Sequence, residues 1–219
     1  MSDGAVSLDS LLAWLRRFAE LVDDQRAYLT ELDSAIGDAD HGANMARGMT
    51  AVTEKLGAAP AGAADELFKT VGMTLVTSVG GASGPLYGTF FLRMGMTAGA
   101  VSSFDGPSLG AALRAGLGGV VARGKAEAGD KTMFDAMAPA LDAWDAAVAS
   151  GASLADAAGS AFAAAEAGRD ATEPLVARKG RASYLGERSA GHLDPGATST
   201  ALLFQALAET LGAAPATGS

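Results

Sequence analysis

Residues 8–29 read LDSLLAWLRRFAELVDDQRAYL, and this stretch shows the pattern from which we predict the fold. Its leucine, phenylalanine and valine side chains recur at helical spacing, while its arginine, glutamate and aspartate side chains fall largely on the other face. That periodicity predicts an amphipathic α-helix. Stretches of similar character predict seven further helices, at about 41–56, 63–78, from 86 onward, 108–124, 133–149, 152–168 and 196–212.

The composition favours the same fold class. Of the 219 residues, 49% are hydrophobic but only 6% are aromatic, and glycine is abundant. Small side chains suit closely packed helices better than a β-sandwich. No alternating pattern of useful length indicates a strand, and short connections favour antiparallel neighbours. We predict one all-α domain over residues 1–219, a helical bundle or barrel with a lid-like loop at 177–195 and a flexible tail at 213–219.

The charge and the cysteine count exclude several classes of function. The net charge is -9 without a basic stripe, so we expect no nucleic-acid partner. No apolar run reaches about 18 residues, so we expect no membrane span. The absence of cysteine excludes disulfides, thiolate metal sites and a cysteine nucleophile. The N-terminus lacks the pattern of a signal peptide, and a cytoplasmic location is the default expectation.

Three aspartates gather in the sequence DSAIGDADHGAN at residues 33–44. If Asp33, Asp38 and Asp40 converge, they repel one another unless a cation lies between them. Hard oxygen ligands favour Mg²⁺ or Ca²⁺, and an extended loop would point Asp38 and Asp40 to one side. The EF-hand spacing fails, because Met49 stands where glutamate is required. Magnesium holding phosphates is the better interpretation, and ordinary loop or N-cap aspartates are the alternative.

The glycine-rich sequence GGASGP at residues 80–85 precedes a predicted helix. Small residues let the backbone approach a phosphate, and the first N–H groups of a helix are unpaired there. Ser83 would either cap the helix or donate to a phosphate. A plain capping turn is the alternative, and this signal alone is weak.

The sequence RGKAEAGDKTM at residues 123–133 superficially resembles a phosphate-binding P-loop. Asp130 separates Gly129 from Lys131, so the required spacing is broken, and a helix instead of a strand precedes it. Met133 would lie against an adenine face or fill the core.

The polar segment 177–195 is too long for a routine connection between helices. It contains basic side chains that suit phosphate, together with Glu187, His192 and Asp194. Its basic residues are Arg178, Lys179, Arg181 and Arg188. A solvated loop with scattered charge is the alternative.

Four blocks together resemble the L subunits of dihydroxyacetone kinases: DSAIGDADHGAN (33–44), GGASGPLYGT (80–89), RGKAEAGDKTM (123–133) and ARKGRASYLGERSAGHLDPGAT (177–198). The resemblance implies an eight-helix antiparallel up-and-down barrel with a nucleotide site in the loops at one end. It implies two Mg²⁺ ions held by Asp33, Asp38 and Asp40. It also implies contacts to ADP or ATP from His41, Gly42, Ala43, Asn44, Ala82, Ser83, Gly124, Met133, Arg181, Asp194, Pro195 and Gly196.

The same resemblance implies a phosphotransferase without a covalent nucleophile on this chain. Dihydroxyacetone would be held by a partner K subunit, and a phosphohistidine phosphotransferase M subunit would rephosphorylate ADP in place. One alternative is an ATP-dependent kinase of the same superfamily acting on another small ketone or sugar. Others are a non-catalytic nucleotide-sensing module that reports to a transcription regulator, and a helical scaffold with a calcium loop. A homodimer is left open.

Overall fold

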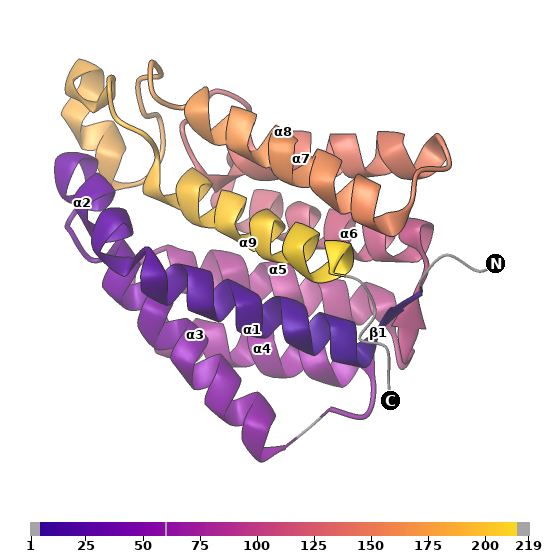
Figure 1. Cartoon of the computed structure of the whole chain (residues 1–219). Coiled ribbons are helices and arrows are strands. Elements are labelled where there is room, and N and C mark those ends of the chain that lie inside the picture. The colour runs from indigo at the N-terminus through magenta and orange to yellow at the C-terminus, as the bar shows by residue number, and fades with distance from the viewer. Residues whose placement is uncertain (1–4, 60, 214–219) are drawn as a thin grey trace.

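The computed structural model describes residues 5–59 and 61–213, and helices make up most of them (Figure 1). The described α-helices are α1 (Leu8–Asp24), α2 (Arg26–Ile36), α3 (His41–Ala58), α4 (Ala64–Ser78), α5 (Ser83–Ala98), α6 (Gly106–Gly124), α7 (Met133–Ala149), α8 (Leu154–Asp170) and α9 (Pro195–Gly212). A 3-10 helix, η1 (Arg181–Ser189), precedes α9, and the short strands β1 (Val6–Ser7) and β2 (Ser103–Phe104) pair antiparallel.

Eight of these helices form a closed ring. From α3 to α9 each α-helix packs on the next one in the chain, and α1 packs on both α9 and α3. Short connections make successive helices run up and down, so every second connection lies at the same end of the barrel. The shorter α2 and η1 lie together at that end, whereas β1 lies at the other (Figure 1). The predicted all-α barrel is therefore confirmed.

Buried aromatic and aliphatic side chains fill the ring, except along α8. Trp14 and Phe91 are fully buried neighbours, whereas α8 contributes only alanines to the buried core. The indole N–H of Trp14 donates to the backbone oxygen of Leu203 at 2.9 Å and thereby joins α1 to α9. Alanine contacts let helix axes approach closely, which explains the scarcity of aromatic residues in the sequence.

The structure corrects two details of the predicted elements. The helix expected over 8–29 is two helices, because the backbone leaves the helical region at Gln25 before α2 begins. The pattern continues across this one-residue break, since Leu29 and Ile36 are buried like the apolar residues before it. The strands were not predicted because two residues are too few to display an alternation.

The lid segment 177–195 has structure of its own, since η1 occupies its centre. The predicted flexible tail lies outside the described residues except for Ala213 and stays a prediction, as does the domain extent of 1–219. None of the described helices is both long and apolar enough to cross a membrane.

Candidate functional site

A cavity of about 770 Å³ lies at the end of the barrel where α2 and η1 meet. Four connections far apart in the sequence line it: 37–40, 79–82, 125–132 and the lid. Twelve of the fifteen residues predicted for the site line this cavity, namely Asp33, Asp38, Asp40, His41, Ala82, Ser83, Gly124, Met133, Arg181, Asp194, Pro195 and Gly196.

The three predicted metal ligands do converge. Asp33, Asp38 and Asp40 each offer an oxygen, and these atoms lie within 4.8 Å of one another. Asp33 is in the last turn of α2, not in a loop as expected, and its Oδ2 accepts from the backbone N–H groups of Asp40 (2.8 Å) and His41 (3.1 Å). The connection is a turn and not extended, because Ala39 has a left-handed backbone with φ of 61°.

Gly37 is required for this corner by a close approach. A Cβ atom on Gly37 would lie only 2.0 Å from Oδ1 of Asp33. The missing side chain therefore leaves room for that carboxylate oxygen. Any larger residue at this position would displace Asp33.

The acidic corner has one cationic neighbour in the described chain. Arg181 on η1 places its Nε 2.9 Å from Oδ2 of Asp38. One guanidinium does not balance three carboxylates, so the corner keeps a net negative charge that favours a bound cation. An all-oxygen donor set of this kind suits magnesium, and the residues therefore fit the ion that the sequence predicted.

His41 is buried behind this corner in a network of hydroxyl groups. Its Nε2 lies 2.9 Å from Oγ of Ser199, and its Nδ1 lies 3.1 Å from Oγ of Ser83. The hydroxyl of Tyr87 continues the network to Ser199 at 2.8 Å and to Thr200 at 3.0 Å. Burial lowers the pKa of His41, although the neighbouring carboxylates oppose this shift. Burial also raises the pKa of Tyr87 to about 12, so both groups remain neutral at pH 7.

Four helices, α3, α5, α7 and α9, begin at the cavity. Their first N–H groups carry the positive ends of the helix dipoles and suit the binding of an anion. No side chain caps α5, so Ser83 does not serve as the cap that the capping-turn alternative requires. The Ser83 hydroxyl instead contacts His41 and lines the cavity.

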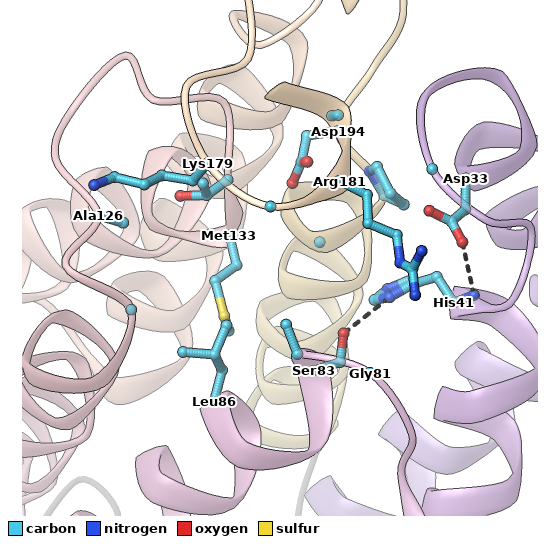
Figure 2. A pocket seen from close by; sticks show the side chains of 18 of the residues that line it. Asp33, His41, Gly81, Ser83, Leu86, Ala126, Met133, Lys179, Arg181 and Asp194 are labelled. Carbon is cyan, nitrogen blue, oxygen red and sulfur yellow. Dashed lines mark hydrogen bonds between the residues drawn. The ribbon is translucent and has the colours of Figure 1, made fainter. Parts of the chain in front are cut away.

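The opposite side of the cavity is largely apolar. Figure 2 shows Met133 and Leu86 on this side and Asp33, His41 and Arg181 on the other. Val120 and Ala126 also line the cavity. An elongated ligand with a flat apolar end and an anionic end would match both sides.

Asp194 is the N-cap of α9 and is almost fully buried at the cavity wall. Its Oδ2 accepts from the backbone N–H of Ala197 at 2.6 Å. Burial raises the pKa of Asp194 to about 7, with Asp135 adding to the shift and Lys131 opposing it. This carboxyl group therefore changes its protonation near neutral pH while no ligand is bound.

Three predicted contact residues do not line the cavity. Gly42, Ala43 and Asn44 lie within α3, where Gly42 and Asn44 are buried. Gly42 faces α2, because a Cβ there would lie 2.1 Å from the backbone oxygen of Arg26. Asn44 accepts a hydrogen bond from Arg47 at 2.7 Å. Their contact with a nucleotide stays a prediction.

Sequence reasoning also missed cavity residues. Leu86 lines the cavity but was not predicted for the site, because helical spacing does not distinguish a cavity wall from the core. Lys131 was set aside with the failed P-loop pattern but lines the cavity. Of the four basic lid residues, only Lys179 and Arg181 line it, whereas Arg178 and Arg188 are exposed elsewhere.

Comparison with known proteins shows the family to which this chain belongs. The DAK2 domain model matches residues 35–209, and the chain therefore belongs to the DAK2 domain family. The match spans every helix from α3 to α8 and most of α9, together with the four connections around the cavity.

Relatives narrow the class further. The chain is 46% identical over 204 residues to the PEP-dependent dihydroxyacetone kinase, ADP-binding subunit DhaL, of Escherichia coli K12, covering 93% of this chain and 97% of the relative. It is 45% identical over 206 residues to the PTS-dependent counterpart of Lactococcus lactis, covering 94% and 99%. It is also 37% identical to the L-erythrulose 1-kinase of Mycolicibacterium smegmatis, covering 92% of this chain but only 35% of that longer protein.

A solved structure shares the fold. The dihydroxyacetone kinase from C. freundii in complex with AMP-PNP and Mg²⁺ matches with a TM-score of 0.69 and 30% identity. The match covers 90% of this chain and 33% of the kinase. The described barrel thus corresponds to about one third of that protein.

Proposed function

We propose that this chain is the ADP/ATP-carrying subunit of a phosphoenolpyruvate-dependent dihydroxyacetone kinase. It would transfer a phosphoryl group from magnesium-bound nucleotide to dihydroxyacetone held on a partner K subunit. A phosphohistidine phosphotransferase M subunit would then rephosphorylate ADP in place. The observation that carries the proposal is the cavity itself, with its acidic corner at one end and its apolar wall at the other.

The roles proposed for individual residues follow from their positions. Asp33, Asp38 and Asp40 would hold two magnesium ions, which when bound neutralise phosphate oxygens. Backbone N–H groups at the beginnings of α5 and α9 would donate to the phosphates. Met133 and Leu86 would pack against the base. No side chain acts as a nucleophile, so the chain contributes positioning and electrostatic stabilisation.

The dihydroxyacetone-binding partner is proposed on the relatives' names and on the site. The proposal assigns the described cavity to the nucleotide, because its acidic corner suits magnesium and its apolar wall suits a base. The relatives that the chain covers almost completely are named as ADP-binding subunits, which implies that another subunit binds the ketone. A transcription regulator as partner, a homodimer and a cytoplasmic location remain predictions from the sequence.

A second function has specific support. The identity to an L-erythrulose 1-kinase shows that family members act on other small ketones. The chain would then be the nucleotide-binding part of an ATP-dependent kinase, and its nucleotide would exchange as a substrate.

Nucleotide content separates the two functions. The protein is purified without added nucleotide and denatured, the released nucleotide is identified, and magnesium is counted by elemental analysis. About one ADP and about two magnesium ions per chain support the carrier function. Empty protein that readily binds added Mg·ATP supports the exchanging kinase, and no binding in either experiment refutes both.

A matched pair of variants tests the metal ligands. Asp38→Asn removes one carboxylate charge from the ligand set and lowers the affinity for Mg·ADP by about 100-fold, because even indirect perturbations of metal ligands cost about 10–100-fold. Asp142→Asn is the control, since it removes the same charge on the outer face of α7, where Asp142 pairs with Arg114. Tight Mg·ADP binding by the Asp38 variant in calorimetry would refute the assignment.

A further inference from the structure

Lys131 is the most completely buried charged side chain near the cavity, with a relative exposure of 1%. In a P-loop the corresponding lysine reaches the phosphates. Here the ammonium group instead donates to four backbone oxygens. The acceptors are Glu173 at 3.3 Å, Leu175 at 3.0 Å, Ser189 at 2.7 Å and His192 at 2.5 Å.

These four oxygens belong to two stretches of chain, one before η1 and one that begins at its last residue. Glu173 and Leu175 lie in the incoming segment 173–177, whereas the outgoing segment 189–192 begins with Ser189, the last residue of η1, and contains His192. The two segments also bond to each other, since the N–H of Gly191 donates to the oxygen of Glu173 at 2.8 Å. The segment 173–192 is therefore closed on itself, and Lys131 attaches it to the connection between α6 and α7.

The closed segment 173–192 contains a residue that contacts the acidic corner. Arg181 lies in η1 and pairs with Asp38 in the acidic corner. On the other side, Thr132 and Met133 follow Lys131 directly and line the cavity. One ammonium group thus joins the apolar wall to the segment that places a guanidinium over the acidic corner.

We propose that Lys131 is a positioning residue that holds the lid, and with it Arg181, in register with the metal-binding aspartates. This inference rests on the proposed function, because it assigns Arg181 to the phosphate end of the nucleotide site. Three N–H donors serve four oxygens that all belong to one segment. The acceptors lie before η1 and from its last residue onward, so the ammonium group joins the two ends of segment 173–192.

The first test is limited trypsin digestion of the full chain without nucleotide. Exposed Arg178 and Arg188 are cleavage sites in the lid, and peptides are quantified by mass spectrometry. Lys131→Met keeps the aliphatic stem but removes every donor. We expect cleavage in the lid to accelerate about tenfold or more, since even one charged hydrogen bond is worth about that factor. Unchanged cleavage would overturn the proposal, as would global loss of helical circular dichroism, which would indicate a general core role.

Chemical rescue makes this test specific to the ammonium group. The chain has no cysteine, so Lys131→Cys introduces a unique thiol. Alkylating it in denaturant with bromoethylamine and refolding restores a lysine-like amine, whereas bromopropane gives an apolar side chain of the same length. We expect the amine to restore slow cleavage of the lid. Equal cleavage of the two products would overturn the proposal.

A double-mutant cycle tests whether Lys131 acts through Arg181. Phosphoryl transfer to dihydroxyacetone is measured with the K subunit for Lys131→Met, Arg181→Ala and the double variant. We expect kcat to fall more than KM rises, and the double variant to be no slower than the slower single variant. Multiplicative losses would overturn the proposal. A wild-type chain that transfers nothing would refute the proposed function alone, because digestion still decides how the lid is held.

Discussion

Replacing Gly42 by alanine tests whether this glycine contacts a nucleotide or allows two helices to meet. A Cβ atom at this position would lie 2.1 Å from the backbone oxygen of Arg26 and 2.5 Å from Oγ1 of Thr30. Both atoms belong to α2, whose last turn carries Asp33. The added methyl group therefore pushes on the helix that supplies a predicted metal ligand.

The distances set the size of the effect. Ordinary contact to a Cβ begins at 3.4 Å, so a contact at 2.1 Å requires α2 to move by 3.4 minus 2.1, or about 1.3 Å. Overpacking of this kind costs about 1–3 kcal/mol of folding free energy. A displacement of about 1 Å at a reacting centre costs about 100-fold in rate. We expect Gly42→Ala to remain folded, to be destabilised by that amount and to lose about 100-fold in phosphoryl transfer.

Gly57→Ala is the control, because Gly57 lies in the same helix and nothing approaches its Cβ position within 4 Å. Alanine there should stabilise the protein by about 0.5–1 kcal/mol, since glycine is the poorer helix former. Urea unfolding and a coupled kinase assay with the K subunit measure both quantities. If Gly42→Ala unfolds and reacts like the Gly57 control, the close approach of α2 to Gly42 does not position Asp33.

Three further outcomes are expected from the structure. Removing magnesium with EDTA should release the nucleotide and lower Tm by about 5–10 °C in a thermal melt. The reason is that a ligand at 100 times its Kd stabilises the folded protein by about 2.7 kcal/mol. An unchanged Tm would exclude a nucleotide held through magnesium. Asp194 has a folded pKa of about 7 against an ordinary 3.8, so in ligand-free protein its contribution to stability falls as pH rises from about 4 to 7 and is lowest above 7. The free energy of unfolding should fall by about 4 kcal/mol in total over this pH range because of Asp194. Urea unfolding should show that Asp194→Asn loses this pH dependence, and parallel curves of unfolding free energy against pH for variant and wild type would contradict it. Trp14→Phe removes a second donor from the oxygen of Leu203, which keeps its helical partner within α9, and should cost about 0.5–1.5 kcal/mol in the same assay; a neutral result would show that this bond does not stabilise the contact of α1 with α9.

The sequence predicted the long helices well because their apolar faces repeat over several turns. It could not predict the break at Gln25, since α2 resumes the same pattern one residue later. The aspartate cluster was visible because three carboxylates stand close together in the sequence. The left-handed turn at Ala39, which brings the three carboxylates together, was not visible in the sequence, because alanine rarely adopts that conformation.

Contacts between distant residues were the least predictable part of the site. The network from His41 through Ser199 to Tyr87 joins three helices, and no local pattern marks its members. Lys131 was overlooked because the P-loop pattern around it fails and was set aside. Its acceptors are backbone oxygens 42 to 61 residues away, and such oxygens carry no sequence signature.

The closure of the ring by α1 and α9 has a consequence for how the molecule folds. The hydrogen bond from Trp14 to Leu203 spans 189 residues, whereas neighbours such as α4 and α5 follow one another in the chain. Local hairpins therefore form early, and the contact of α1 with α9 is slow because the intervening chain must first be ordered. During synthesis, a ribosome-bound chain that lacks α9 also lacks one wall of the cavity. A nucleotide bound in the cavity would therefore stabilise only molecules in which α9 has docked, because the beginning of α9 lines the cavity.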